Sequence, residues 1–446
     1  MGRRLIIEKF GKIKKAELEI SPLTLLVGDN NSGKSYLLSL LWGIYTADGE
    51  SVLFQGMEEL LRTDYSQVYE KLRDFILSLK QNSEKETQIT SQIVVEILNH
   101  LLRQNKDQFV AGIFNSKQVI IERLEIAADH EFKLSIKGQS MGERIYFQYC
   151  PSGGLSFSAE MLEYDYELVL KMLMVNIFLW YFKGNKYYGN YNTVYLPAAR
   201  TGFLLAKNVI NQVGRQIAYD VSGLSERGEI QPFTKPIIRF LDKLENLSLD
   251  RKTEYDDIVS WMEESMVHGK IQYGSKISES DIRYMPNSGG NSLPLRASSA
   301  VVTEVAPLLL LLKYGRKLSA ICYEEPEMCL HPKLQQEMGR LLIRLVSHGI
   351  CMIATTHSDI IVQHINNMCQ IKEMGCPEEL MKKLSLSAED VIGIQDIAIY
   401  QFQDRGDDSV VEKLTPENGE FRVKTFSNAL MELLTQTTEV QDFELG

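Results

Sequence analysis

The chain has 446 residues, more than a single hydrophobic core normally supports, so several domains or a large insertion are expected. Hydrophobic residues make up 44% and charged residues 24%, a balance typical of globular proteins that excludes a disordered or fibrous chain. The net charge is −11, so bulk charge gives no support for nucleic-acid binding, which would need a local basic patch.

The six cysteines form no CxxC pair and have no histidines at zinc-finger spacing, so we expect reduced thiols. The N-terminus, MGRRLIIEKF, lacks the apolar core of a signal peptide. The longest apolar run, residues 168–182, is interrupted by Lys171 and Asn176 and is too short to cross a bilayer. We therefore expect a cytoplasmic protein without a membrane segment.

The N-terminal segment predicts a strand, a glycine loop and a helix in succession. Residues 4–8 and 16–20 alternate in polarity and are predicted to be strands. Residues 23–27, LTLLV, are almost wholly apolar, as in strands of α/β proteins that are buried on both faces. The loop GDNNSGKS follows, and residues 36–45 are apolar at helical spacing.

Residues 51–192 have a different pattern, which predicts a mixed, mostly helical insertion between two parts of one core. Its predicted helices cover residues 57–80, 91–102 and 161–182, and a β-like part covers 118–157. A cluster of Gly, Asn and Tyr at 183–192 is expected to end the insertion.

The core is expected to resume at residue 193. Predicted strands cover residues 193–196, 318–323 and 350–355, and predicted helices cover 203–221, 235–247, 301–314 and 333–348. A small α/β end piece should follow, with strands at 398–402 and 420–423 and a helix near 428–434. The predicted division is core 1–50, insertion 51–192, core 193–372 and end piece 373–446.

The first motif is GDNNSGKS, residues 28–35, which fits the P-loop pattern GxxxxGK[ST]. Backbone N–H groups of such a loop, together with the helix N-terminus behind it, bind phosphates. Lys34 is predicted to reach the β- and γ-phosphates of ATP, and Ser35 to hold Mg²⁺. The predicted nucleotide-binding residues are Gly28, Asn30, Asn31, Ser32, Gly33, Lys34, Ser35 and Tyr36.

The second motif is an apolar strand that ends in adjacent carboxylates, Glu324 and Glu325, the Walker B arrangement. We expect Glu324 to hold the metal and Glu325 to position or deprotonate the attacking water. The alternative is a solvated acidic turn. A third strand ends in His357, which we predict senses the γ-phosphate; a structural hydrogen-bonding histidine is the alternative.

These motifs resemble ABC-type ATPase heads of the overcoming-lysogenization-defect (OLD) family and the related AAA_15 and AAA_21 families, distant relatives of structural-maintenance-of-chromosomes (SMC) proteins. The resemblance rests on the P-loop, on EEPE at 324–327 followed by LHP at 330–332, and on the switch histidine, His357. It covers residues 1–50 and 193–372 and implies an α/β P-loop NTPase of ABC/SMC-head type that hydrolyses ATP with Mg²⁺.

The resemblance also implies a short signature element that completes the nucleotide site of an opposite subunit. It corresponds to Ala297–Ala300, with Ser298 and Ser299 as the residues acting in trans, although Ala300 replaces the family's glycine. Arg200 lies in a stretch similar to a family element and is a candidate phosphate or interface contact; a plain surface arginine is the alternative. Because this element would complete the nucleotide site of another subunit, we expect two or more copies to assemble through their nucleotide sites.

Three functions are compatible with these motifs. The first is the ATPase component, a switch or scaffold, of an antiviral defence complex of Septu-, retron- or PARIS-like type, whose separate effector could be a nuclease. No nuclease centre is predicted here, because the acidic stretch 404–408 is interpreted as a loop. The second is a RecF-type DNA repair ATPase that clamps DNA, and the third is an ATP-gated scaffold with little hydrolysis.

Overall fold

The computed structural model describes residues 3–79, 84–128, 133–141, 144–151, 157–162, 169–170, 172–173, 175–177, 192–207, 210, 233–248, 253–274, 282–424, 434–438 and 440. The chain divides into two units. The first comprises residues 1–20 and 43–191, and the second comprises 21–42 and 192–446. No helix in the described ranges is both long and apolar enough to cross a membrane.

The unit boundaries differ from the predicted division in the placement of residues 1–20, of residues 43–50 and of the end piece. Residues 1–20 and 43–50, expected in the core, cluster with the insertion; strand β1 (Arg3–Phe10) pairs with strand β5 (Ile121–Ala128) of the insertion. The end piece does not form a unit of its own, because its strand β15 (Ile397–Asp404) pairs in parallel with strand β3 (Leu23–Gly28). The predicted resumption of the core at residue 193 lies one residue from the boundary at 191/192.

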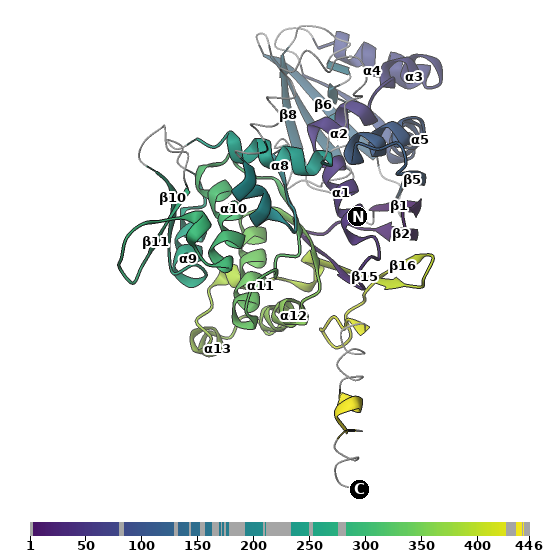
Figure 1. Cartoon of the computed structure of the whole chain (residues 1–446). Coiled ribbons are helices and arrows are strands. Elements are labelled where there is room, and N and C mark those ends of the chain that lie inside the picture. The colour runs from purple at the N-terminus through teal and green to yellow at the C-terminus, as the bar shows by residue number, and fades with distance from the viewer. Residues whose placement is uncertain are drawn as a thin grey trace, which may run out of the picture. The chain divides into compact units, whose positions relative to one another are not determined.

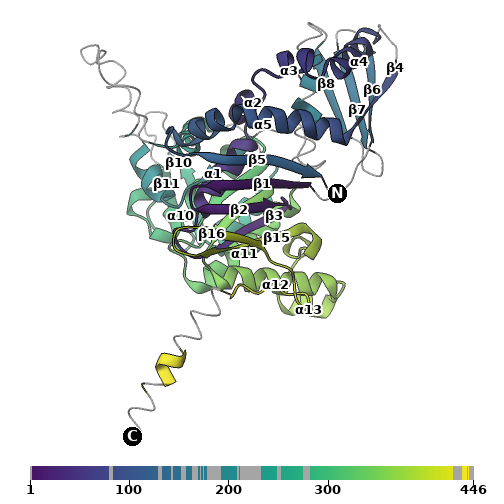
Figure 2. The same cartoon turned by 90° about the vertical axis from the view of Figure 1, so that its right-hand side faces the viewer.

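The first unit contains two antiparallel sheets and several helices. In one sheet the order is β5-β1-β2, and in the other it is β4-β6-β7-β8 (Figure 2). Helix α5 packs on β5 and on α2. The strands are β1 (Arg3–Phe10), β2 (Ile13–Leu18), β4 (Glu84–Thr90), β5 (Ile121–Ala128), β6 (Lys133–Met141), β7 (Arg144–Pro151) and β8 (Phe157–Leu162). The helices are α2 (Ala47–Leu53), α3 (Met57–Thr63), α4 (Ser66–Leu77) and α5 (Ser91–Phe114).

Several predictions for this unit need correction. The single helix predicted at 57–80 is two helices, α3 and α4, and the helix predicted at 91–102 continues to Phe114. Strand β4 was missed, because its polar sequence EKETQIT gives little strand signal. The helix predicted at 161–182 begins later, since residues 161–162 belong to β8; residues 169–170, 172–173 and 175–177 are helical. Residues 183–191 lie outside the described ranges.

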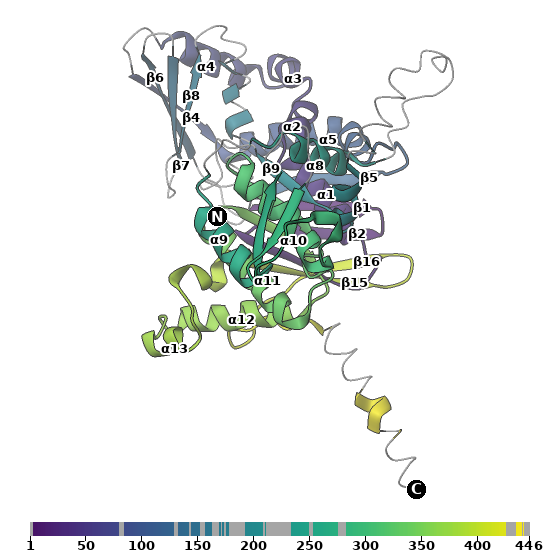
Figure 3. The same ribbon diagram turned by 60° about the vertical axis from the view of Figure 1, so that its left-hand side comes forward.

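The second unit is built on a mostly parallel sheet with the order β16-β15-β3-β14-β13-β9. Strands β15, β3, β14, β13 and β9 run in parallel, and β16 is antiparallel to β15. A small antiparallel sheet, β10-β11-β12, lies beside α9 and α10 (Figure 3). The strands are β3 (Leu23–Gly28), β9 (Thr193–Leu196), β10 (Gly269–Tyr273), β11 (Ile282–Pro286), β12 (Leu293–Pro294), β13 (Ala320–Glu324), β14 (Cys351–Thr356), β15 (Ile397–Asp404) and β16 (Ser409–Lys413).

The helices of this unit and the strands of its sheet pack together in its main hydrophobic core. Leu23, Leu25 and Val27, at alternate positions of β3, pack in one cluster with apolar residues of α10, α11 and α12. Figure 1 shows α9, α10 and α11 together beside the sheet. The helices are α1 (Lys34–Ile44), α8 (Lys235–Glu245), α9 (Asp256–Ser265), α10 (Ala300–Tyr314), α11 (Pro332–Ser347), α12 (Asp359–Glu373) and α13 (Glu378–Lys383), with 3-10 turns η3 (Leu295–Ala297), η4 (Ala388–Asp390) and η5 (Ile394–Asp396).

The core strands predicted at 23–27, 193–196, 318–323 and 350–355 are confirmed within two residues, as are the helices at 235–247, 301–314 and 333–348. Of the helix predicted at 203–221, residues 203–207 are helical and 211–221 lie outside the described ranges. The strand predicted at 420–423 is wrong, since only an isolated bridge, Glu417–Glu420, forms there. Of the closing helix, only residue 434 is described, and it is helical.

Candidate functional site

The loop between β3 and α1 has a backbone that glycine makes possible. Gly28 and Gly33 have φ angles of +119° and +97°, values that L side chains rarely adopt. A Cβ atom on Gly28 would also lie 2.1 Å from the carbonyl oxygen of Phe402 in β15. Asn31, at φ +56°, occupies the left-handed region that asparagine tolerates. The loop therefore has the tight, glycine-dependent form predicted for a phosphate cradle.

Lys34, at the first position of α1, turns back over this loop. Its Nζ donates to the carbonyl oxygen of Gly28 at 3.1 Å and to that of Asp29, and it lies 3.4 Å from Ser32 Oγ. The side chain is 6% exposed, and burial lowers the pKa of Lys34 to about 8 against the opposing effect of the carboxylates of Glu325 and Asp29. The buried ammonium group of Lys34 thus lies against the loop between β3 and α1, on the side of α1.

Glu324, the last residue of β13, and Glu325, which follows it, lie at the same edge of the sheet. The backbone N–H of Glu325 donates to the carbonyl and hydroxyl oxygens of Thr355 in β14, at 3.1 and 3.2 Å, with Glu325 at φ +41°. Glu324 Oε2 accepts a hydrogen bond from the N–H of Ala198 at 3.0 Å. The side chain of Glu325 is 39% exposed. The carboxylate of Glu324 is therefore held by a backbone donor, whereas at Glu325 the hydrogen bonds to Thr355 hold the backbone.

His357 follows β14 and faces Glu325. Its Nε2 lies 3.9 Å from Glu325 Oε1, and its backbone N–H donates to Glu327 Oε1 at 2.6 Å. Burial, together with the charge of Lys34, lowers the pKa of His357, so the ring is neutral at neutral pH. The structure thus brings together Glu325 and His357, as the sequence predicted, with Lys34 close enough to influence both.

Glu327 and Asp29 are site residues that the sequence analysis did not assign. Glu327 orients the backbone of His357, and burial raises the pKa of its carboxyl group. Asp29 Oδ2 accepts a hydrogen bond from the N–H of Asp404 at 3.0 Å, which ties the P-loop to the end of β15. Both contacts join residues far apart in the sequence, so they could not be predicted from neighbouring residues. The EEPE motif, which includes Glu327, was the one sequence signal for that residue.

Arg200 lies in the interior, so its interpretation as a surface arginine is wrong. The side chain is 1% exposed, and its Nε lies 2.9 Å from Glu304 Oε2 of α10. Its guanidinium donates to the carbonyl oxygens of Glu324 at 3.0 Å and Glu325 at 3.3 Å and stacks on the Tyr323 ring at 4.9 Å. These contacts occupy the guanidinium inside the protein, which is not the arrangement of a phosphate or subunit contact.

Ser298 and Ser299 precede α10. Ser299 is its N-cap residue and makes no side-chain capping hydrogen bond, and its side chain is exposed. The first N–H groups of such a helix have no partner within the helix and favour an anion. Tyr36, the last predicted nucleotide-binding residue, is 40% exposed in the first turn of α1.

The oxygen ligands at this site suit Mg²⁺. Ser35 is exposed in the first turn of α1, and Glu324 ends β13 with one carboxylate oxygen held by Ala198. A hydroxyl and a carboxylate are hard oxygen ligands of the kind that Mg²⁺ prefers. Asn30, between Asp29 and Asn31, lies in the turn of the loop.

Comparison with solved structures places SMC heads among the similar proteins. An SMC head bound to the C-terminal winged-helix domain of ScpA has a TM-score of 0.36 and 13% identity, covering 93% of this chain and 97% of that one. The SMC head domain from Thermotoga maritima has a TM-score of 0.32 and 10% identity, with coverages of 92% and 98%. The Pyrococcus furiosus SMC head with an extended coiled coil, bound to the C-terminal domain of ScpA, has a TM-score of 0.34 and 12% identity, with 98% of both chains covered.

Comparison with curated proteins gave no match. The family described as "AAA ATPase domain" (AAA_15) matches residues 1–141 and 198–362, more than half of the chain. The matched ranges include the P-loop, Glu324, Glu325 and His357, together with residues 51–141 of the predicted insertion. The predicted fold class, an α/β P-loop NTPase whose core is split by an insertion, is confirmed. The chain belongs to the AAA_15 family of AAA ATPase domains and is a P-loop ATPase.

Proposed function

We propose that this protein hydrolyses ATP and uses the nucleotide to join copies of itself. The observation that carries the proposal is the meeting of Lys34, Glu325 and His357 where β3, β13 and β14 end. In open parallel sheets, ligands bind at this carboxyl edge of the strands. The P-loop would bind the phosphates, with Lys34 at the β- and γ-phosphates, and Ser35 and Glu324 would hold Mg²⁺.

The chemistry assigned to these side chains is a displacement by water. Bound Mg²⁺ would neutralise charge on the phosphates. Glu325 accepts a proton from the water as its oxygen bonds to the γ-phosphorus and the bond to the β–γ bridging oxygen breaks. Neutral His357, 3.9 Å from Glu325, can donate a hydrogen bond to the γ-phosphate or the water. Glu327 holds the backbone of His357 in place for that role.

The second copy would supply the N-terminus of α10, where Ser299 is exposed and makes no capping hydrogen bond. Helix α10 also carries Glu304, the partner of Arg200, and Arg200 binds the carbonyl oxygens of Glu324 and Glu325. A γ-phosphate bound at the start of α10 would therefore affect, through Glu304 and Arg200, the position of the backbone turn that carries Glu325. We assign Arg200 as the positioning residue of this connection, in place of its predicted phosphate contact.

The wider role is an antiviral defence complex with a separate effector, as the family resemblance implies. The acidic stretch 404–408 comprises the last residue of β15 and the turn to β16. A tagged Glu325→Gln chain, held in its ATP-bound form, should copurify with the protein encoded beside it. Recovery of the chain alone under these conditions would contradict the proposed complex with a separate effector.

Replacement of Lys34 by alanine tests the nucleotide site itself. We expect the Lys34→Ala protein to lose measurable ATP binding and at least 10²–10³-fold of the phosphate-release rate, since a donor aimed at the transferring group is removed. Exposed Lys270 offers a matched control, and Lys270→Ala should keep both properties. Turnover by Lys34→Ala within a few-fold of the wild type would overturn the assignment.

The affinity for ATP is expected to fall as the pH rises through about 8. The pKa of Lys34 is about 8 in the nucleotide-free protein, because burial disfavours its charge, whereas bound phosphates need the ammonium form. Binding above pH 8 then takes up a proton, so the dissociation constant rises by up to about tenfold per pH unit. Titration with a fluorescent ATP analogue between pH 7 and 9.5 measures this, and a constant affinity would contradict it.

A further inference from the structure

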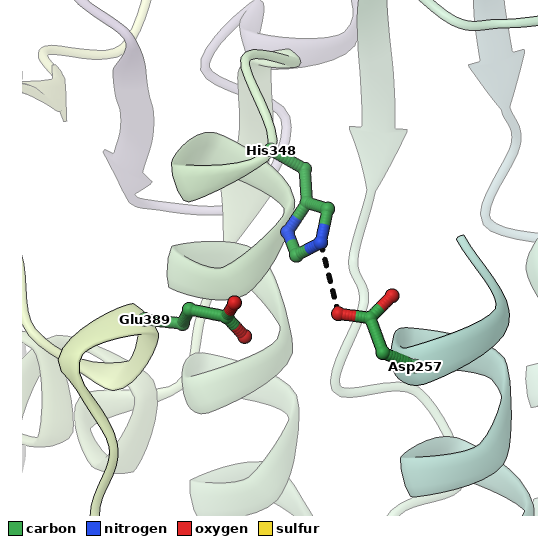
Figure 4. Close-up of side chains that lie close together, drawn as sticks. All are labelled: Asp257, His348 and Glu389. Carbon is green, nitrogen blue, oxygen red and sulfur yellow. Dashed lines mark hydrogen bonds and ion pairs between the residues drawn. The ribbon is translucent and has the colours of Figure 1, made fainter. Parts of the chain in front are cut away.

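Three side chains with metal-binding atoms converge on the second unit, away from the residues assigned to nucleotide. Asp257 lies in the first turn of α9, His348 caps the C-terminus of α11, and Glu389 belongs to η4. One ligand atom from each lies within 4.8 Å of the other two. Figure 4 shows the ring of His348 with Asp257 on one side and the carboxylate of Glu389 nearby.

The hydrogen bonds of His348 fix which ring nitrogen can bind a cation. Its Nδ1 lies 3.0 Å from the carbonyl oxygen of Arg344, and a carbonyl only accepts, so Nδ1 carries the hydrogen. In the neutral ring, Nε2 then presents a lone pair. That nitrogen lies 3.0 Å from Asp257 Oδ2, where a ring proton or, in its place, a bound cation joins the two atoms. Glu389 offers a carboxylate oxygen within 4.8 Å of both atoms.

Arg344 contacts His348 directly and contacts a residue close in sequence to each of the other two ligands. Its carbonyl orients His348, and its Nε donates at 2.6 Å to Asp390, the fully buried neighbour of Glu389. Its guanidinium also stacks at 4.5 Å on Trp261, one helical turn after Asp257. Outer contacts that orient ligands in this way are typical of metal sites, where a ligating histidine gives its other N–H to a carbonyl or carboxylate.

We propose that Asp257, His348 and Glu389 form a zinc site. One imidazole nitrogen and two carboxylate oxygens are a ligand set that Zn²⁺ accepts, with water in the remaining position. Solvent can reach the site, because the side chain of Asp257 is 54% exposed and that of His348 is 18% exposed. The ion would join α9, the end of α11 and η4, so it would stabilise this part of the ATPase unit independently of the nucleotide.

The test is zinc content and zinc affinity of the full chain, stripped with chelator, reloaded with zinc chloride without nucleotide and passed through a desalting column. We expect His348→Gln to retain one zinc ion fewer per chain than the wild type, and its affinity at this site to fall about tenfold or more, since a ligand is lost. Asp257→Asn, at an exposed position, should have the same effect. Zinc should raise the melting temperature of the wild type and not of these variants.

Exposed His268 provides the matched control, because its Nδ1 also contacts a carbonyl oxygen four residues earlier, at 2.7 Å. His268→Gln should bind as much zinc as the wild type. This comparison subtracts zinc held by thiols or by the nucleotide site, which all variants share. Equal zinc content in the wild type, His348→Gln and Asp257→Asn would overturn the proposal, as would an equal loss in His268→Gln.

Discussion

Replacing Glu325 by glutamine is expected to lower ATP turnover by about 10²–10⁴-fold, the usual contribution of a general base. Glutamine has nearly the same shape but cannot take the proton from water. The backbone contacts of residue 325 with Thr355 do not involve the side chain, so the turn and the P-loop should keep their geometry. The variant should therefore bind ATP as the wild type does and remain in the ATP-bound form.

Phosphate release and ATP binding, measured on the same preparation, separate these two effects. Glu412, exposed on β16, serves as a matched position, and Glu412→Gln should retain full turnover. Full turnover in Glu325→Gln would show that another group accepts the proton. Loss of ATP binding along with turnover would show that the Glu325 side chain has a binding role.

Replacing Arg200 by methionine is expected to cost about 3–5 kcal/mol of unfolding free energy. Methionine has a similar length, but the change leaves Glu304 with an unpaired charge at a position 4% exposed. Removing one partner of a buried ion pair typically costs this much, because the remaining charge stays desolvated. The carbonyl oxygens of Glu324 and Glu325 lose a donor as well.

Urea unfolding of the nucleotide-free protein measures this cost. Arg239→Met removes an exposed arginine that pairs with Asp242 within α8 and should change stability by no more than about 0.5 kcal/mol. A change below about 1 kcal/mol for Arg200→Met would contradict the assigned role. As a positioning residue, Arg200 should also affect turnover more than ATP affinity in the fraction that remains folded.

The sequence predicted those parts of the fold whose signals are local. Residues 23–27, 318–323 and 350–355 are apolar runs of strand length, and buried parallel strands have this composition. Strand β15 was placed in a separate end piece, because nothing local shows that it pairs with β3, more than 360 residues earlier. The small sheet β10-β11-β12 and helix α9 were missed for a related reason, since their short segments depend on packing against α10.

The residues of the candidate site also divide into those with a local sequence signal and those that depend on distant contacts. The P-loop, Glu324, Glu325 and His357 were recognised because each motif is a short segment at the end of a strand. The burial of Arg200 could not be inferred from neighbouring residues, since its ion-pair partner lies 104 positions later, in α10. Arginine is usually exposed, so the sequence predicted a phosphate or interface contact, with a plain surface arginine as the alternative. Only the structure shows that its charge is compensated.

The most direct test of ATP-dependent assembly is the mass of the purified Glu325→Gln protein in solution, measured with and without ATP and Mg²⁺. We expect the mass to rise to twice that of the chain, or a higher multiple, only when both are present, with Lys34→Ala unchanged in either condition. A mass that stays the same with saturating ATP bound would contradict the proposal that the nucleotide joins copies of this ATPase.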